Sequence, residues 1–406
     1  MPLTVHLPVR ASSVGTSARD AFHRIPAGRD TIRPATIGLL STYPPTQCGL
    51  ATFSAALLEQ LGRPAGAVGV VRVVDQAESH PGAEVVAHLV NGSTDSAITA
   101  VRHLNSFDAV VVQHEYGIYG GPDGCDVLDI VDALTVPTIV VFHTVLQEPT
   151  LRQRRILQRL LRSADVVVTM TETARRRLVE GYGADPAHVT MISHGAVDHG
   201  VIRTGRRTTG RPLLLTWGLL GPGKGIEWAI DAMPGLRDLQ PRYLVIGKTH
   251  PKVLERDGED YRKCLLLRVE LRGVGDIVEL DDSYLGVAEL ADLVESADVV
   301  LLPYDSSDQV TSGVLIEAVA AGRPVVSTAF PHAIELLTDG LGLVVPQRDP
   351  AALGSALRRV LSEPGLADTM AARAAHKAPD LSWGAVAGQY RQIAEALVAA
   401  VPAVAS

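Results

Sequence analysis

The chain has 406 residues, of which 46% are hydrophobic, 20% charged and only 4% aromatic, and its formal net charge is −8. This composition supports two or three domains with aliphatic cores, and it argues against a general nucleic-acid binder, which would present a basic surface. Three cysteines without a C-x-x-C pair exclude a disulfide framework and favour free thiols in a reducing cytosol.

The N-terminus, MPLTVHLPVRASSVG, lacks the apolar stretch of a signal peptide. No run approaches the roughly 20 apolar residues of a membrane span. We therefore expect a cytoplasmic protein without stable membrane insertion. Residues 1–34 carry scattered Ser, Arg, Pro and Gly without a clear period, and they are expected to form an irregular extension.

From residue 35 to residue 200, short apolar runs such as ATIGLLST, AVVVQ and TIVVF alternate with stretches of helical spacing such as ATFSAALLEQL. Strands that alternate with helices of this length form parallel βαβ units. A polar, Gly- and Arg-rich linker is expected at 201–211, and a second alternating series at 212–380. The chain is therefore predicted to be an α/β protein with two doubly wound, Rossmann-like domains, whose ligands bind beyond the carboxyl ends of the strands.

The segment LLLTWGLLGPGKGIEWAI predicts a strand that ends at Gly218, a Gly-rich turn, and a helix that starts near Ile226. Helix N-terminal amides together with Lys224 suit a phosphate group. The alternative is a plain strand-to-helix turn with an exposed lysine. A nucleoside triphosphatase loop is excluded because Gly225 stands where Ser or Thr should hold magnesium, and the third glycine of a dinucleotide fingerprint is absent.

The segment DVVLLPYDSSDQVTSGVLIEAVAAGRPVVST predicts a strand, a polar loop and a helix. The amides near Ser312 and Gly313 can face a diphosphate, and the carboxylate of Glu317 can accept hydrogen bonds from two ribose hydroxyls. Alternatively, Glu317 is an ordinary glutamate on a helix surface.

These motifs resemble those of the retaining glycosyltransferases of family 4, over nearly the whole ordered chain, from about Ala35 to Tyr390. The resemblance implies the GT-B fold, in which two Rossmann-like domains face a central cleft and a C-terminal helix, here 381–406, crosses back to the N-terminal domain. The family hallmark is two glutamates separated by seven residues; Glu317 fits the second, whereas Gln309 replaces the first.

In the lysine segment, Lys224-Gly225 fits the family's diphosphate site, but Leu219 replaces the customary arginine. We expect His250, or alternatively Lys248, to compensate for the missing cation. In the N-terminal half, STYPPTQCGLATF resembles the family's first loop, and its glycine, Gly49, is expected to let the backbone approach the donor phosphates.

The resemblance places His143, from VVFHTVLQ, near the donor sugar, and we assign it to the catalytic group with Gln309. The segment QHEYGIYGGPDG adds Glu115, with His114, beside a Gly-rich loop for which an acceptor-binding or lid role competes with simple loop capping. No metal site is expected because the histidines are scattered. The arginine runs at 152–155 and 175–177 are interpreted as solvated helix faces.

The function implied by the resemblance is transfer of a hexose, with retention, from a nucleoside diphosphate sugar to the hydroxyl of a small-molecule or glycan acceptor. GDP-mannose is the first choice of donor, and a UDP- or ADP-hexose is the alternative. No cofactor is expected. Two other readings remain open: another GT-B enzyme, either an epimerase or a phosphorylase, and a nucleotide-sugar-binding protein without catalysis.

Overall fold

A computed structural model describes residues 34–63, 68–76, 82–200 and 210–401. The expected extension at 1–34 and the expected linker at 201–211 lie almost wholly outside the described residues. The chain divides into two compact units, 1–193 with 383–406, and 194–382.

The boundary between the units falls after Ser193 and not at residue 200, where the sequence pattern placed it. The reason is that the next residues are bound to the second unit. The amide of Ala196 donates to the carbonyl of Leu381 at 2.7 Å, and that of Val197 donates to Glu317 at 3.3 Å.

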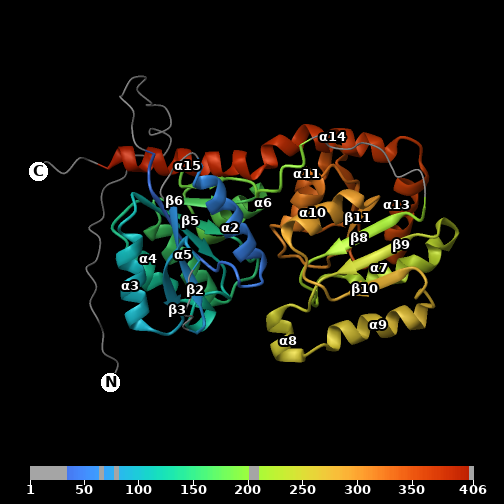
Figure 1. Ribbon diagram of the computed structural model, residues 1–406, viewed down its shortest axis with the longest axis horizontal. Helices are drawn as coiled ribbons and strands as arrows, with labels where there is room; N and C mark the ends of the chain where they lie inside the picture. Colours follow the sequence, from blue (N-terminus) through green and yellow to red (C-terminus); the bar gives the residue numbers. More distant parts are fainter. Residues whose placement is uncertain (1–33, 64–67, 77–81, 201–209, 402–406) are drawn as a thin grey trace, which may run out of the picture. The chain divides into compact units, whose positions relative to one another are not determined.

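The first unit contains a seven-stranded parallel sheet in the order β3-β2-β1-β4-β5-β6-β7 (Figure 1). Its strands are β1 (Ile37–Ser41), β2 (Val68–Val74), β3 (Val85–Val90), β4 (Ala109–His114), β5 (Thr138–Phe142), β6 (Val166–Thr169) and β7 (Val189–Met191). Its helices are α2 (Gly49–Leu61), α3 (Thr94–Leu104), α4 (Val127–Ala133), α5 (Leu151–Ser163), α6 (Glu172–Tyr182) and α15 (Trp383–Ala400), with a 3-10 turn η1 (Pro122–Gly124).

The helix α15 belongs to the first unit although it is the last element of the chain. Its buried side chains Trp383, Val386 and Tyr390 join one apolar cluster with Phe53 and Leu57 of α2. Burial of such side chains stabilises the pair by roughly 1.5–3 kcal/mol each, so this packing holds α15 firmly on the sheet.

The second unit contains a six-stranded parallel sheet in the order β10-β9-β8-β11-β12-β13. Its strands are β8 (Leu213–Trp217), β9 (Arg242–Ile246), β10 (Val278–Asp281), β11 (Val299–Leu302), β12 (Val325–Thr328) and β13 (Gly342–Val345). Its helices are α7 (Ile226–Ala232), α8 (Pro251–Asp257), α9 (Asp260–Arg272), α10 (Val287–Ser296), α11 (Gly313–Ala320), α12 (Pro331–Leu336), α13 (Pro350–Ser362) and α14 (Leu366–Leu381), with the 3-10 turns η2 (Met233–Leu239) and η3 (Thr338–Gly340).

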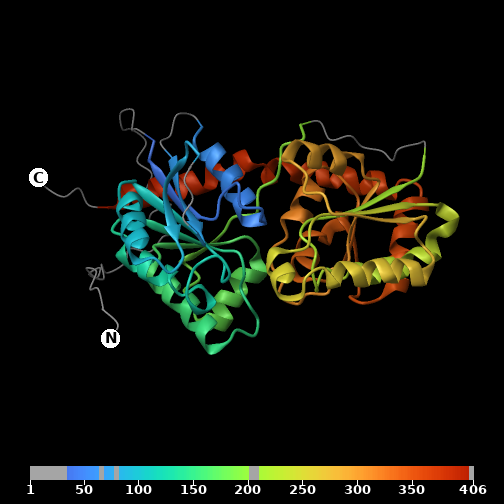
Figure 2. The same cartoon turned by 60° about the horizontal axis from the view of Figure 1, so that its bottom comes forward.

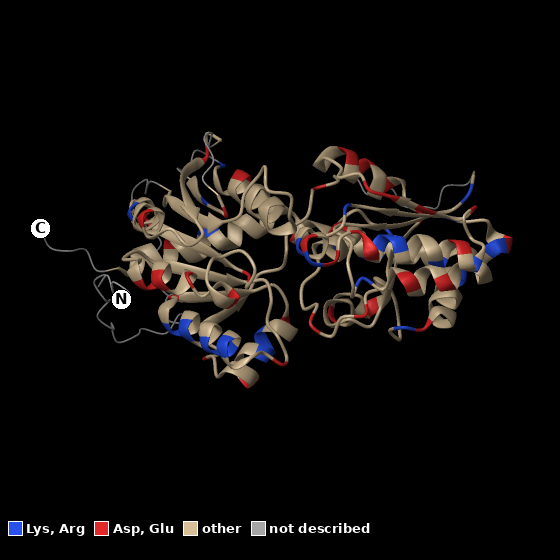
Figure 3. Ribbon diagram, turned by 90° about the horizontal axis from the view of Figure 1, so that it is seen from below, with Lys and Arg blue, Asp and Glu red and all other residues tan. Residues whose placement is uncertain are grey.

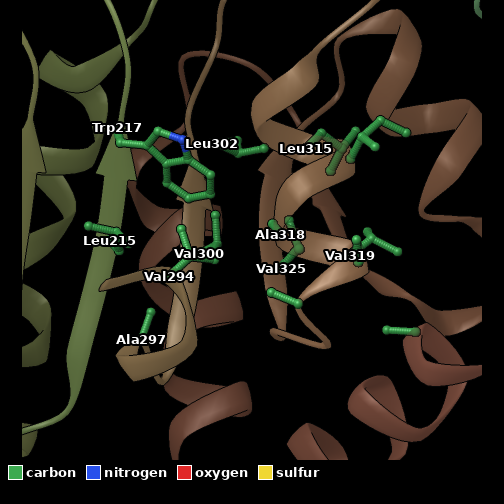
Figure 4. Close-up of a cluster of buried hydrophobic side chains, with 14 of the residues drawn as sticks. Leu215, Trp217, Val294, Ala297, Val300, Leu302, Leu315, Ala318, Val319 and Val325 are labelled. Carbon is green, nitrogen blue, oxygen red and sulfur yellow. The ribbon is translucent and has the colours of Figure 1, made fainter. Parts of the chain in front are cut away.

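Both faces of each sheet are covered by helices (Figure 2), so the strands are apolar on both sides, as expected of parallel sheets. In β8, Leu214 belongs to the cluster on one face and Leu215 to that on the other, because successive side chains point in opposite directions. Figure 4 shows the second cluster, in which Trp217, Leu302 and Leu315 lie together between the strands and α11. The prediction of two Rossmann-like α/β domains is confirmed.

Basic residues recur along α5, as Figure 3 shows, and several of them are paired. Arg159 contacts Asp132 at 2.5 Å, and on α6 Arg175 contacts Glu172 at 2.9 Å. Within the described ranges, no helix combines the length and apolar character needed to cross a membrane.

Candidate functional site

The strand order of the second unit reverses direction between β8 and β11, which lie side by side although β9 and β10 intervene in the chain. The carboxyl ends of strands at such a switch point open a crevice where α/β proteins bind ligands. Two loops leave the sheet here: residues 218–225 after β8, and residues 303–312 after β11. They carry the predicted donor-site residues of the C-terminal half, apart from Gly313, Glu317 and His250.

The loops 218–225 and 303–312 contact each other at Gly223 and Gly225. The amide of Asp305 donates to the carbonyl of Gly223 at 3.1 Å. Gly225 has a φ of +62°, and a Cβ there would lie 1.9 Å from the carbonyl oxygen of Pro303. Gly218 also has a positive φ, +114°, and it packs beside Val314 at the start of α11. Only glycine suits this approach at residue 225, so the sequence of the turn determines how close the loops come.

Lys224 lies between two such glycines. Its Nζ is 4.2 Å from the centroid of the Tyr304 ring, a cation–π distance. Tyr304 is buried and packs against the Phe330 ring at a centroid distance of 5.0 Å. Lys224 therefore stands at the switch point with its ammonium over an aromatic face.

The loop at 247–250 is joined to the lysine loop by two backbone hydrogen bonds of 2.8 Å, from Leu220 to Lys248 and from His250 to Leu220. The imidazole of His250 caps α8 by accepting the amide of Lys252 at 3.2 Å. Partial burial and the charges of Lys252 and Lys224 lower the pKa of His250 below its usual 6.5. A neutral imidazole does not replace the arginine charge missing at Leu219. The structure therefore does not support His250 as the compensating cation.

Ser312 caps α11: its hydroxyl accepts the amide of Leu315 at 3.3 Å. Its own amide donates to Nδ1 of His332 at 2.8 Å. The expectation that the Ser312 amide faces a diphosphate is therefore corrected, because that donor is already used. Helix geometry leaves the amides of Gly313 and Val314 as first-turn donors without intrahelical acceptors.

Gly313 lies against a histidine that the sequence reading missed. A Cβ at Gly313 would be 2.8 Å from Nε2 of His194. His194 donates its Nδ1 hydrogen to the carbonyl of Gly195 at 2.6 Å, and burial lowers its pKa to about 4. Burial lowers the pKa of His332 further, to about 3. Both imidazoles are thus neutral at pH 7. Their only sequence signal is a histidine in each of the segments ISHGAVD and TAFPHAIEL, the second of which contains the helix α12.

Glu317 lies one turn into α11 and is half-buried. Its Oε2 accepts the Val197 amide, and burial raises the pKa of the carboxyl to about 7. Gln309 lies in the same loop system, where its side-chain amide donates to the carbonyl of Thr311. The carbonyl of Gln309 in turn accepts the His332 amide at 3.4 Å. The Gln309 side chain thus contributes to holding its own loop.

The first unit has its own switch point, between β1 and β4. Gly49 is the first residue of α2 after β1; it is exposed, and a Cβ there would meet nothing within 4 Å. Packing within the described chain therefore does not require glycine at this position. The loop before it is held by Arg72, which donates Nε to the carbonyl of Tyr43 at 2.9 Å and an NH2 hydrogen to Thr46 at 2.9 Å.

His143 follows β5, and its Nε2 lies 2.6 Å from Oε1 of Gln113, the penultimate residue of β4. Because an amide oxygen only accepts, the imidazole carries its hydrogen on Nε2. The edge of the ring packs on Phe53 at a centroid distance of 4.9 Å, and Phe53 packs on Trp383 at the same distance. Gln113 is fully buried and was not anticipated from the sequence.

Glu115 follows β4 and accepts two hydrogen bonds, from the Tyr116 amide at 2.9 Å and from the Thr144 hydroxyl at 2.5 Å. His114 differs from expectation. It is the last residue of β4 and is fully buried between aromatic rings, so its pKa falls to about 3. His114 is a core residue and not a loop residue, because the β4 ladder continues through it in a parallel sheet whose two faces are both covered.

The Gly-rich loop at 116–126 is anchored along its length. The Tyr119 hydroxyl donates to the Gln113 carbonyl at 2.6 Å, Asn91 donates to the Ile118 carbonyl at 3.0 Å, and the Asp126 amide donates to the Gly120 carbonyl at 3.1 Å. These hydrogen bonds favour a fixed loop over a mobile lid. Among the described residues, no group of three or more His, Cys, Asp or Glu side chains could hold a metal ion.

Two family profiles match the chain. One, described as Glycosyl transferases group 1, covers residues 211–363, and the other, Glycosyltransferase Family 4, covers residues 69–198. Two parallel α/β units, each with polar side chains at its switch point, have the GT-B type of fold, and both matched profiles describe glycosyltransferases. Residues 211–363 thus match the group 1 glycosyl transferases, and residues 69–198 match the family 4 glycosyltransferases.

Curated relatives are similar over part of their length. The chain is 31% identical over 255 residues to the D-inositol 3-phosphate glycosyltransferase of Kineococcus radiotolerans, with 57% of each chain covered. It is 31% identical over 242 residues to a glycogen synthase of Mycobacterium tuberculosis, covering 58% of this chain and 55% of the relative. The chain thus spans little more than half the length of these relatives.

Solved structures share the fold over most of the chain. Anabaena HepE in complex with UDP and glucose has a TM-score of 0.72 at 15% identity and covers 89% of this chain and 100% of its own. A UDP-forming trehalose-phosphate synthase from Burkholderia vietnamiensis has a TM-score of 0.66 at 12% identity, with the same coverage. At these identities the similarity concerns the fold alone.

Proposed function

We propose that the chain transfers a hexose from a nucleoside diphosphate sugar to an acceptor hydroxyl, with retention at the anomeric carbon. The observation that carries this proposal is the position of Lys224, whose Nζ lies 4.2 Å from the Tyr304 ring at the β8–β11 switch point. The start of α11 adjoins the same loops, and its Gly313 and Val314 amides suit an anion.

In this proposal, Lys224 and the first-turn amides of α11 bind the diphosphate, and Glu317 accepts hydrogen bonds from the ribose. The bond from the anomeric carbon to the diphosphate oxygen breaks, and Lys224 stabilises the charge that develops on the leaving group. The acceptor oxygen forms its bond to the anomeric carbon on the same face, and its proton passes to a diphosphate oxygen. His143 and Glu115 are proposed to act on the sugar or the acceptor.

The donor is proposed by chemical class. UDP and glucose in a structure of similar fold, and a UDP-forming synthase of similar fold, favour UDP-glucose as the first donor to test. GDP-mannose and ADP-glucose remain in the panel. We further propose that side chains and amides, without a resident metal ion, neutralise the diphosphate. Free cysteines at Cys48, Cys125 and Cys264 fit the proposed cytoplasmic location.

The test is calorimetric titration of the full chain with UDP-glucose, GDP-mannose and ADP-glucose, followed by acceptor screening with the donor that binds. Lys224→Ala and Glu317→Ala should each weaken donor binding at least tenfold, since each removes a charged hydrogen-bonding partner worth about 1.5–3 kcal/mol. Unchanged binding in both variants would overturn the assignment of the site.

A nucleotide-sugar-binding protein without turnover is the second candidate. It is favoured by the side chain of Gln309, which is directed to the carbonyl of Thr311, and by the absence of a cation at Leu219. Donor binding without transfer to any acceptor in a broad panel would support it. Product analysis with and without acceptor would also separate a transferase from an epimerase or a phosphorylase of the same fold.

A further inference from the structure

We propose that Tyr304 is a positioning residue for Lys224: its ring holds the ammonium at the phosphate crevice and leaves the charge without a carboxylate partner. This inference rests on the proposed function, because it concerns the same diphosphate site. The contact itself is the 4.2 Å separation of Nζ from the ring centroid. A lysine over an aromatic face is attracted by the ring quadrupole while its hydrogens stay available.

The ring is a rigid platform. Tyr304 is 1% exposed and packs on Phe330, whose centroid is 5.0 Å away. The backbone carbonyl of Tyr304 accepts the hydroxyl of Thr328, which ends the neighbouring strand β12. A buried ring with a fixed backbone moves little, so it restricts where the flexible lysine side chain rests.

A carboxylate that could neutralise Lys224 is held elsewhere. Asp305 is the next residue in the loop, yet its Oδ2 lies 3.3 Å from Nε of Arg348 and 3.5 Å from Nε1 of Trp228. Within the described part of the chain, Lys224 forms no ion pair. An incoming phosphate therefore does not have to displace a carboxylate from the lysine.

The geometry of both loops sets this pairing. Gly223 and Gly225 flank the lysine with φ values of +89° and +62°. The first accepts the Asp305 amide through its carbonyl, and the second packs on the Pro303 carbonyl. The neighbours of Lys224 thus contact the neighbours of Tyr304, and these contacts bring the lysine and the tyrosine together. This orientation matters because Leu219 supplies no second charge.

The ring, and not the hydroxyl, carries the effect. The buried Tyr304 hydroxyl has no hydrogen-bond partner among the described residues. Phenylalanine should therefore serve nearly as well as tyrosine, whereas an aliphatic residue of similar bulk should not. This distinction separates a role in positioning Lys224 from a role in filling the core.

The experiment compares the full chain with Tyr304→Leu, Tyr304→Phe, Lys224→Ala and the double variant Tyr304→Leu/Lys224→Ala. Calorimetry with UDP and with GDP measures diphosphate affinity. Tyr304→Leu should weaken binding roughly 3–30-fold, the range that cation–π contacts contribute. Tyr304→Phe should recover most of that loss. In the Lys224→Ala background, Tyr304→Leu should change the affinity less than about twofold, because its partner is absent.

A ligand-free measurement separates this inference from the proposed function. Acetylation of Lys224 by acetic anhydride, followed by mass spectrometry, should be faster in Tyr304→Leu than in the wild type or in Tyr304→Phe. If Lys224 is acetylated faster in Tyr304→Leu but the wild type binds no nucleotide, the proposed function is wrong and the lysine–tyrosine contact is confirmed.

Equal labelling in all three proteins would overturn the inference, as would equal loss of affinity in both Lys224 backgrounds. Tyr390→Leu is the matched control for losing a buried tyrosine: Tyr390 is fully buried in the first unit, and its hydroxyl is also unpartnered among the described residues. This control should lower the melting temperature and leave the affinity for UDP and GDP unchanged.

Discussion

The amide of Val197 donates to Oε2 of Glu317 at 3.3 Å, which ties the segment after Ser193 to the helix α11. This bond favours the charged carboxylate, but burial outweighs it and raises the pKa of Glu317 from 4.5 to about 7. The carboxyl of Glu317, which we propose binds the ribose, is therefore about half ionised near neutral pH. This affects both the stability of the fold and the binding of the donor.

The first consequence is for stability. A raised folded pKa means that the folded chain binds a proton more tightly than the unfolded chain between pH 4.5 and about 7. The contribution of Glu317 is fully present below pH 4.5 and is lost as the pH rises to about 7. Glu317→Gln, which stays neutral, should therefore be more stable than the wild type at pH 8, by roughly 1–3 kcal/mol.

Thermal melting of both proteins from pH 5 to pH 8 checks this. The difference in melting temperature should be small at pH 5 and should grow as the pH rises. Glu270→Gln, at an exposed site on α9, is the control and should show no such trend. A constant difference across the range would contradict an elevated pKa at Glu317.

The second consequence is for ligand binding. Ribose hydroxyls donate to the ionised carboxylate, so donor binding should lower the pKa of Glu317 and release a proton near pH 7. Affinity should rise with pH between 6 and 8. Calorimetry in two buffers of different ionisation enthalpy measures the released proton, and the heat of binding should differ between them. Glu317→Gln should bind more weakly, with a heat that depends less on the buffer; an identical dependence would assign the proton to another group.

Much of the fold could be predicted because it follows from local patterns. Apolar runs of strand length between helical periods identify β8 and β11, and glycines around Lys224 identify the turn. Partners that are distant in sequence could not be predicted in this way. His332 lies 20 positions from Ser312, and Gln113 lies 30 from His143, yet both are within hydrogen-bond distance. Strand pairing and the packing of loops and helices bring such residues together, and the sequence pattern gives neither.

The same limit explains two misplaced features. The sequence pattern extends the first domain to residue 200 because the polarity change at the linker is conspicuous in sequence, whereas the hydrogen bond from Ala196 to Leu381 of the second unit is not. The sequence pattern places His114 after the strand and beside the Gly-rich loop, whereas the β4 ladder continues through it and pairs it with Phe142.

Donor binding should be sensitive to adding even one methyl group at Gly313. Alanine there would place a Cβ 2.8 Å from His194 Nε2, closer than side chains tolerate, so the imidazole or the start of α11 must shift. Gly313→Ala should weaken donor binding about tenfold, which corresponds to roughly 1.4 kcal/mol. Calorimetry measures the affinity, and circular dichroism confirms the fold. The control is Gly181→Ala on α6, where nothing lies within 4 Å of the new methyl group. That variant should be stabilised by about 0.5–1 kcal/mol and should bind the donor normally.

Gln113 should orient His143 in the proposed reaction. Its Oε1 fixes the hydrogen of the imidazole on Nε2, and Phe53 confines the ring from the side. Gln113→Leu removes the acceptor and leaves a buried site of similar size, so kcat should fall about tenfold or more with little change in donor affinity, as expected for lost orientation. Gln113→Glu keeps the acceptor and adds a negative charge, which favours the imidazolium. The acidic limb of the pH–rate profile should then move to higher pH than in the wild type. If both variants reduce kcat equally with unshifted profiles, Gln113 only fills the core, and His143 is oriented by other contacts.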